Sequence, residues 1–124
     1  MIEGVIASVS PEDRLRQAFD AYNRQDADAL LVMMSADVRW ATDRKPLHGK
    51  YELRRYWDRQ WQRIRTHDQV VRIERISDVM YAVVLEQIVC SLNGTTLSTG
   101  RFVYRFVVKF GLIEALLSIT ATTA

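Results

Sequence analysis

The chain has 124 residues, of which 48% are apolar and 26% charged, and its formal net charge is +2. This length suffices for one domain with its own core, and the composition is that of an ordinary soluble globular protein. So small a net charge argues against a nucleic acid or an anionic membrane as partner, because both require a strongly basic surface. We therefore expect a single domain over residues 1–124, with no nucleic-acid and no membrane partner.

The chain contains one cysteine, Cys90, which rules out an internal disulfide and favours a reducing compartment. Residues 1–10 lack the features of a signal peptide, and no window approaches the roughly 20 apolar residues that span a bilayer. These features predict a cytoplasmic protein. His48, His67 and Cys90 are too scattered to indicate a metal site, and there is no glycine-rich phosphate loop, so we expect neither metal nor cofactor.

Two helices are predicted at the start of the chain, separated by a short break. Ser10 can cap the first helix, and Pro11 suits its first turn. Apolar residues then recur at spacings of three and four, at Leu15, Ala18, Phe19 and Tyr22. Residues 23–26 interrupt this pattern, and Asp26 can cap a second, shorter helix.

A short strand and a third helix follow. Apolar and polar residues alternate from Val38 to Thr42, which is typical of a strand, and Asp43–Pro46 has the composition of a loop. The helix is expected from about Lys50 to Arg63. One face of it carries Leu53, Trp57, Gln60 and Ile64. Gln60 is a polar group at the centre of this apolar face.

From residue 69 onward the pattern is that of β-strands. The predicted strands are Gln69–Ser77, Met80–Leu92, Thr96–Lys109 and Leu112–Thr122. Asn93-Gly94 is a strong hairpin signal between two of them. Helices followed by consecutive antiparallel strands indicate an α+β fold, with the helices on one face of a curved sheet.

The order and spacing of several segments resemble the SnoaL-like branch of the nuclear-transport-factor-2-like superfamily over about the whole chain. These segments are the break at 23–26, Leu47-His48-Gly49, Tyr56-Trp57 with Gln60-Trp61, and residues 102–106 leading to Gly111-Leu112-Ile113. The resemblance implies a cone-shaped α+β barrel, in which three N-terminal helices pack on a strongly curved, mainly antiparallel sheet around an apolar pocket. This fold hosts enzymes and non-enzymes alike, so it leaves the activity open.

Glu86 is the strongest catalytic candidate, because it is the only charge on the strand face that it shares with Val84 and Ile88. A carboxyl in an apolar pocket has a raised pKa, which suits a general acid or base. We expect Glu86 to point into the pocket. Alternatively, it is hydrogen-bonded to a core Tyr, Trp or Arg, or the strand faces the other way. Asp43, after the first strand, is either a second catalytic carboxylate at the pocket mouth or a solvated loop residue.

Aromatic side chains are expected to line the pocket, since in a cone fold the same residues form both the core and the pocket wall. Tyr22, Gln60 and Tyr104 can orient a polar group of a bound molecule. The candidate ligand-binding residues are Tyr22, Trp40, Trp57, Gln60, Trp61, Phe102 and Tyr104.

Ketosteroid isomerases of this superfamily use a Tyr on the first helix, a base Asp after the first strand, and a protonated Asp on the aromatic strand. In this chain the matching positions fall on Ala18, Thr42 and near Phe102, with Asp43 one residue late. The resemblance therefore implies that the oxyanion hole of those isomerases is absent.

Three functions remain open at this point. One is an acid–base enzyme of the cyclase, isomerase, dehydratase or epoxide hydrolase type, which acts on an apolar ring-containing substrate through Glu86 with help from Asp43. Another is a non-catalytic binding or carrier domain for a hydrophobic small ligand. A third is an interaction module whose product is the dimer itself.

A homodimer through the sheet is expected. Both faces of the strand at 80–92 are apolar, whereas a lone cone covers only its concave face. Val83, Leu85 and Val89 would then form an exposed patch, which a twofold-symmetric dimer would bury.

Overall fold

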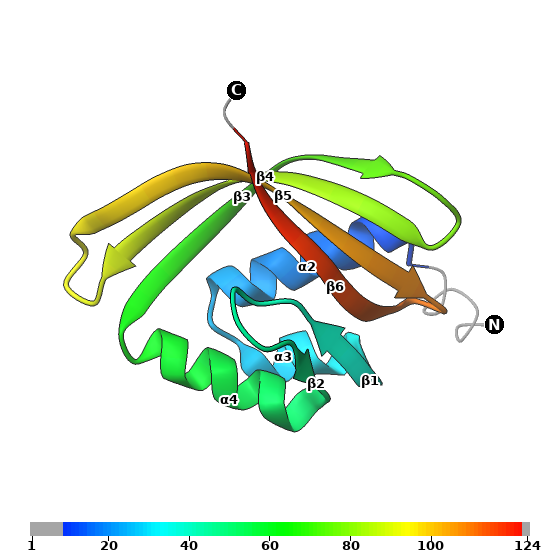
Figure 1. Ribbon diagram of the computed structural model, residues 1–124, viewed down its shortest axis with the longest axis horizontal. Helices are drawn as coiled ribbons and strands as arrows, with labels where there is room; N and C mark the ends of the chain where they lie inside the picture. Colours follow the sequence, from blue (N-terminus) through cyan, green and yellow to red (C-terminus); the bar gives the residue numbers. More distant parts are fainter. Residues whose placement is uncertain (1–8, 123–124) are drawn as a thin grey trace.

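The computed structural model describes residues 9–122 as three helices packed against one six-stranded sheet (Figure 1). The helices are α2 (Pro11–Asn23), α3 (Ala27–Val32) and α4 (Lys50–Trp61). The strands are β1 (Met34–Trp40), β2 (Leu47–His48), β3 (Ile64–Arg75), β4 (Met80–Ser91), β5 (Thr96–Lys109) and β6 (Leu112–Thr122). The predicted α+β class is confirmed. None of these helices has the length and hydrophobicity to cross a membrane.

The sheet is curved and does not close into a barrel. Its strand order is β2-β1-β6-β5-β4-β3, and every neighbouring pair is antiparallel except β1 with β6. Register shifts interrupt the pairing of β3 with β4 between Val70 and Arg72, and that of β5 with β6 between Arg105 and Phe106. Because such bulges bend and twist strands, they help the sheet to curve around the helices.

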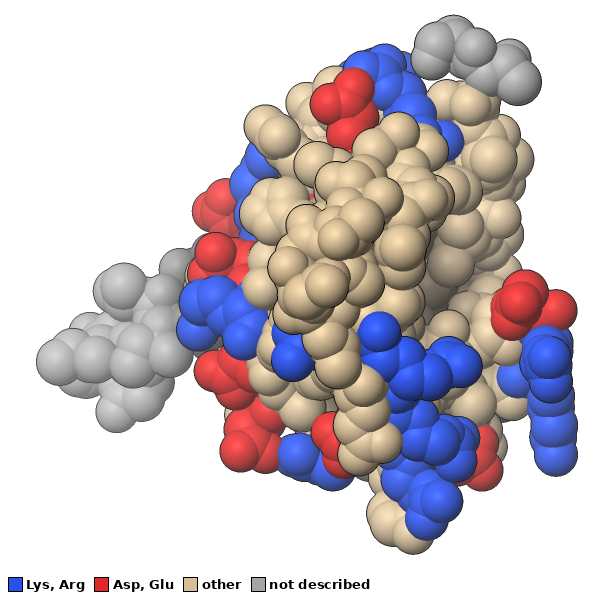
Figure 2. Space-filling model, turned by 90° about the vertical axis from the view of Figure 1, so that its left-hand side faces the viewer, with Lys and Arg blue, Asp and Glu red and all other residues tan. Residues whose placement is uncertain are grey.

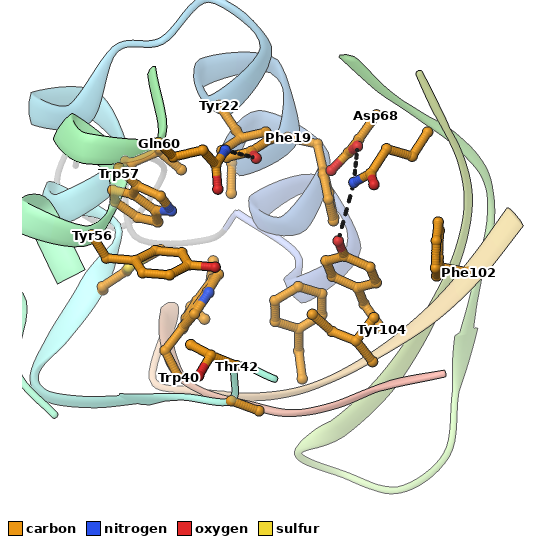
Figure 3. A pocket seen from close by; sticks show the side chains of 18 of the residues that line it. Phe19, Tyr22, Trp40, Thr42, Tyr56, Trp57, Gln60, Asp68, Phe102 and Tyr104 are labelled. Atoms are coloured by element: carbon orange, nitrogen blue, oxygen red, sulfur yellow. Dashed lines mark hydrogen bonds between the residues drawn. The ribbon is translucent and has the colours of Figure 1, made fainter. Parts of the chain in front are cut away.

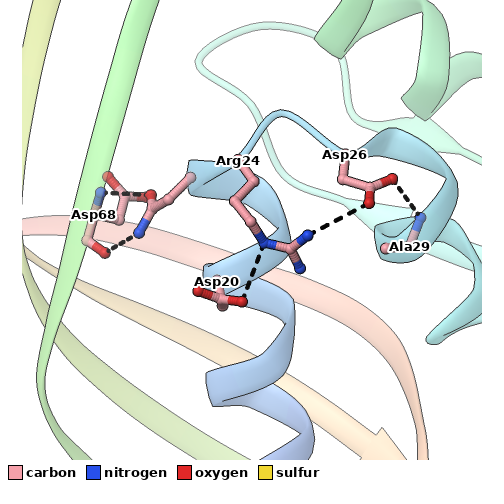
Figure 4. A network of polar contacts seen from close by, with 6 residues as sticks. Asp20, Arg24, Asp26, Ala29 and Asp68 are labelled. Carbon is pink, nitrogen blue, oxygen red and sulfur yellow. Dashed lines mark hydrogen bonds and ion pairs between the residues drawn. The ribbon is translucent and has the colours of Figure 1, made fainter.

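The predicted helix caps are present. The side chain of Ser10 caps α2, and the side-chain oxygen of Asp26 accepts a hydrogen bond from the Ala29 N–H at 3.0 Å at the start of α3. Between the two helices, Arg24 lies 3.2 Å from Asp20 and 3.6 Å from Asp26 (Figure 4). This short break therefore turns the chain sharply from one helix into the next.

The face of strand β4 that packs against the core is the opposite of the one expected. Val83 and Leu85 are completely buried in the core. Glu86 lies on the outer face, where its side chain is 54% exposed and its carboxylate accepts a hydrogen bond from Arg101 at 2.6 Å. The prediction that Glu86 points into the pocket is therefore wrong. The prediction of an exposed patch that contains Val83 and Leu85 is also wrong. Since both faces of β4 are apolar, alternation alone could not decide which one meets the helices.

Strand β3 begins at Ile64, whereas the sequence predicted a start at Gln69. Its first residues are mostly polar, which concealed the strand, yet Thr66 and Asp68 are buried. Strand β1 also lies earlier than predicted, while β5 and β6 have the predicted bounds. The start of β3 matters for function, because it carries a polar side chain into the interior.

Two neighbouring alanine substitutions test the orientation of β4. Leu85→Ala should lower the free energy of unfolding by about 2–5 kcal/mol, because it leaves a cavity in a fully buried site. Glu86→Ala should lower it by less than about 1 kcal/mol, since an exposed ion pair contributes little. Urea denaturation followed by tryptophan fluorescence measures both, and a larger loss for Glu86→Ala would mean that β4 faces the other way.

Candidate functional site

A cavity of about 460 Å³ lies between the helices and the concave face of the sheet (Figure 3). Six aromatic rings among its lining residues form a connected wall: Phe19, Tyr22, Trp40, Trp57, Tyr104 and Phe106. Neighbouring rings pack mainly edge to face, as in the pair Trp40 and Trp57, whose centroids are 5.7 Å apart at 87°. This arrangement is the favoured one for aromatic pairs and gives the cavity a well-packed wall.

Most of the predicted ligand-binding residues line this cavity. They are Tyr22, Trp40, Trp57, Gln60, Phe102 and Tyr104. Trp61 does not line it, contrary to expectation, and instead stacks on Trp57 with centroids 6.1 Å apart. Of the two predicted catalytic carboxyls, Asp43 reaches the cavity from its exposed loop, whereas Glu86 lies outside it. The structure thus separates Glu86 from the residues with which it was expected to act.

Asp68 on β3 is the carboxyl that the sequence did not single out. It is only 3% exposed and lines the cavity. Gln87 Nε2 on β4 donates a hydrogen bond to its Oδ1 at 2.9 Å. Its other oxygen, Oδ2, has no hydrogen-bond partner within residues 9–122. A bound molecule can therefore meet a free carboxylate oxygen here.

The surroundings of Asp68 change its acidity. Burial raises the pKa of Asp68 to about 6, opposed in part by the hydrogen bond from Gln87 and by the charge of His67. A carboxyl with such a pKa exists in both protonation states close to neutral pH. It can therefore accept a proton and return it, as a general acid–base group must.

Tyr104 on β5 stands beside this carboxyl. Gln87 Nε2 also donates to the Tyr104 hydroxyl in a longer contact of 3.4 Å, so one amide group connects the two side chains. Burial and then the negative charge of Asp68 raise the pKa of Tyr104 well above its usual range. The Tyr104 hydroxyl consequently keeps its proton at neutral pH and can donate it to a hydrogen bond with a ligand.

Tyr22 on α2 forms a second polar group at the same end of the cavity. Its hydroxyl oxygen accepts hydrogen bonds from Gln60 Nε2 at 2.6 Å and from Thr66 Oγ1 at 2.7 Å. Burial, followed by the charge of Asp68, raises the pKa of Tyr22 to about 12. This network explains why a glutamine occurs at the centre of the aromatic face of α4.

Asn23, the last residue of α2, fixes the backbone on which Asp68 is carried. Asn23 Nδ2 donates to the Asp68 carbonyl oxygen at 2.9 Å, and the Asp68 N–H donates to Asn23 Oδ1 at 2.8 Å (Figure 4). The break at 23–26 therefore has a structural purpose beyond ending the helix, because it holds β3 against α2.

The positions that match the ketosteroid isomerase catalytic groups, Ala18, Thr42 and Phe102, all line the cavity but carry no ionisable group. Within residues 9–122, the cavity is lined by two carboxyls, Asp43 and Asp68, and by no Lys, Arg or His. The same part of the chain has no cluster of three His, Cys, Asp or Glu residues that could hold a metal ion. The proton-transfer chemistry available to the cavity therefore centres on Asp68.

The variant Asp68→Asn tests the ionisation of this carboxyl through stability. Because the folded-state pKa is raised above the ordinary value near 4, the wild type loses stability as the pH rises from about 4 to about 6, by about 3 kcal/mol in all. Asn keeps the hydrogen bond from Gln87 but cannot ionise. The variant should therefore match the wild type near pH 4 and exceed it by up to about 3 kcal/mol near pH 7.5.

Chemical denaturation of both proteins at each pH measures this difference. A difference that stays constant with pH would mean that Asp68 titrates as an ordinary aspartate.

Solved structures share this fold at low sequence identity. A proposed polyketide cyclase from Pseudomonas putida KT2440 superposes with a TM-score of 0.78 at 16% identity, over 94% of this chain and 93% of its own. The Δ5-3-ketosteroid isomerase from Mycobacterium sp. superposes with a TM-score of 0.74 at 21% identity, over 92% of this chain and 100% of its own. An LEH-like epoxide hydrolase from M. tuberculosis superposes with a TM-score of 0.71 at 13% identity, over 82% of this chain and 75% of its own. At these identities the likeness shows the fold alone.

Sequence comparison is more specific about the family. None of the curated proteins matches the chain significantly. The family model of the SnoaL-like domain, however, matches residues 15–115, a span that runs from α2 into β6 and includes Asn23, Asp68, Gln87 and Tyr104. This match covers most of the chain and agrees with the observed fold, so the chain belongs to the SnoaL-like domain family.

Proposed function

We propose that this protein binds a small ring-containing organic molecule in the cavity and transfers a proton on it, with Asp68 as the acid–base group. The observation that carries the proposal is a buried carboxyl that lines the cavity, has a pKa of about 6, and has one oxygen without a hydrogen-bond partner in residues 9–122. The cavity volume of about 460 Å³ is within the range of small-molecule sites, and its aromatic wall suits a ring system.

The polar groups around Asp68 suggest how such a transfer proceeds. As a carboxylate, Asp68 removes a proton from the bound molecule, and as an acid it returns the proton to another atom. Tyr104 donates a hydrogen bond to the atom on which electron density accumulates. Gln87 contacts both side chains and keeps them oriented. This chemistry belongs to the cyclase, isomerase, dehydratase or hydrolase type. The fold is shared with proteins described as a polyketide cyclase, a ketosteroid isomerase and an epoxide hydrolase, which supports the proposal.

The second candidate is a non-catalytic binding or carrier domain for a hydrophobic ligand. It is favoured by the lack of any ionisable group at Ala18, Thr42 and Phe102, the positions that match the isomerase catalytic groups. Asp43, which reaches the cavity from an exposed loop, would in either case contact the outer end of the ligand.

Hydrogen exchange into a simple ring ketone tests for catalysis without knowledge of the natural substrate. We expect the wild type to speed the exchange of the α-protons of β-tetralone in heavy water, as followed by proton NMR. The rate should rise with pH up to about 6, as Asp68 ionises, and then level off. Asp68→Asn should lower it by roughly 100-fold or more and Tyr104→Phe by roughly 10-fold.

The variant Glu86→Gln provides the comparison for this experiment. If Glu86 were the base, its replacement would abolish exchange and Asp68→Asn would leave the rate intact. Binding of β-tetralone with no exchange above the buffer rate would support the carrier function instead.

We also propose that the protein forms a homodimer through the outer face of its sheet. Ile88, which follows Glu86 on that face of β4, is 42% exposed in a single chain. Light scattering at micromolar concentration should give twice the mass of the chain, and Ile88→Asp should return it to the monomer mass. A monomeric wild type would contradict this proposal.

A further inference from the structure

The cavity contains a buried negative charge, and no positively charged side chain among residues 9–122 lines it, although the charge of His67 acts on Asp68 from outside the cavity. Asp68 is 3% exposed, and none of the Lys, Arg or His side chains in residues 9–122 lines the cavity. Its only hydrogen-bond donor in that part of the chain is the neutral amide of Gln87. With a pKa of about 6, the carboxyl is nevertheless mainly ionised at pH 7. Buried charges in proteins are normally paired, so a partner of opposite charge is missing from this site.

We propose that the bound molecule supplies this partner, as an apolar ring compound that carries a protonated amine or an iminium nitrogen placed against Asp68. This inference rests on the proposed function and adds the charge of the ligand. Without a ligand, the carboxylate oxygen Oδ2 lacks a partner within residues 9–122. With such a ligand, it accepts a charge-assisted hydrogen bond or forms an ion pair.

The remaining lining of the cavity suits the same kind of ligand. Aromatic rings attract a cation placed over their faces within about 6 Å of the ring centre. The wall of six rings has neighbouring centroids 5.7–6.5 Å apart, as for Trp40 with Trp57 and for Tyr22 with Trp57 (Figure 3). In addition, the side-chain oxygens of Gln60 and Gln87 have no hydrogen-bond partner among the described residues, so they can accept from an N–H group.

Proton transfer in this cavity is also easier from a cation than from a neutral molecule. When Asp68 removes a proton from the carbon next to an iminium group, the C–H pair becomes the carbon–carbon double bond of an enamine. The former C=N pair becomes the nitrogen lone pair, and the carboxylate becomes a neutral acid. Both charges disappear, which a low-dielectric site favours. Removing a proton from a neutral carbon acid would instead leave an anion that the Tyr104 hydroxyl can stabilise, but in a cavity that no Lys, Arg or His of residues 9–122 lines.

Basic residues on the surface do not reverse this preference. Figure 2 shows Lys and Arg side chains over one face of the molecule, most of them in its lower half and others at its upper and left edges. No Lys or Arg of residues 9–122 lines the cavity. The charge of His67 opposes the rise in the pKa of Asp68, and the charge of Arg63 opposes the rise in the pKa of Tyr56. Neither residue lines the cavity. At physiological salt, interactions between exposed charges are largely screened beyond about 8 Å, whereas the buried Asp68 is screened much less.

Three probes with one ring system and different charge test the inference: naphthylmethylamine, naphthylmethanol and naphthoate. Isothermal titration calorimetry near neutral pH should show that the cationic amine binds the wild type at least roughly tenfold more tightly than the alcohol, and that naphthoate binds most weakly. Asp68→Asn should remove the advantage of the amine and leave the alcohol nearly unchanged. Asp37→Asn, which alters an exposed carboxyl on β1 away from the cavity, should retain the full advantage.

The comparison among the three probes needs only the wild type, so it decides the question even if Asp68→Asn fails to fold. Equal binding of amine and alcohol, or tighter binding of naphthoate, would overturn the inference and leave the proposed function standing, because the cavity would still hold a ring compound. Binding of none of the three would overturn both. An amine advantage that survives in Asp68→Asn would also overturn the inference, since the charge would then be recognised elsewhere.

Discussion

Two hydrogen bonds between the side chain of Asn23 and the backbone of Asp68 join the end of α2 to β3, and the site depends on this junction. β3 is an edge strand of the curved sheet, so only one side of it pairs with a strand, β4. Its first residues are held on the helix side by this connection and by the hydrogen bond from Thr66 to Tyr22. The connection places the Asp68 side chain in the interior, within reach of the Gln87 amide. Asn23 therefore forms hydrogen bonds with the Asp68 backbone, and Gln87 donates a hydrogen bond to the carboxylate oxygen Oδ1. The other carboxylate oxygen, Oδ2, is available to a bound molecule.

The cavity has a well-packed aromatic wall and a polar end, at which some hydrogen-bonding groups have no partner within residues 9–122. Buried polar groups usually complete their hydrogen bonds within the protein, and a group left open in a cavity is therefore a good indicator of a ligand. The Tyr22 hydroxyl oxygen accepts two hydrogen bonds, from Gln60 and Thr66, so its main role is to join these side chains, and it retains only its proton for a ligand. Among residues 9–122, the carboxyl of Asp68 and the hydroxyl of Tyr104 have only the amide of Gln87 as a hydrogen-bond partner, so they retain the most capacity to bind a ligand. This difference separates the groups that build the site from those that can act in it.

Much of the fold follows from local chemistry that can be seen in the sequence. The caps at Ser10 and Asp26 and the strands β5 and β6 were predictable, because capping and regular alternation act over a few residues. Two features depend on contacts between residues that are distant in sequence. The orientation of β4, and with it the position of Glu86, is set by which face the helices cover, and both faces are apolar. The start of β3 could not be recognised in the sequence, because its inward residues, Thr66 and Asp68, are polar and resemble a loop. The residues to which they are hydrogen-bonded, Tyr22 and Gln87, are distant in sequence. A sign was present in Gln60 and Gln87, polar groups in otherwise apolar faces that require a buried partner.

The proposed function requires Asp68 to be a buried carboxyl with both protonation states populated near neutral pH. A carbon NMR titration of its side-chain carboxyl measures this directly, with Asp68→Asn used to assign the resonance. We expect a titration midpoint of about 6. A midpoint near the ordinary aspartate value of about 4 would contradict it, because the carboxyl would then be neither desolvated nor suited to proton transfer in this cavity.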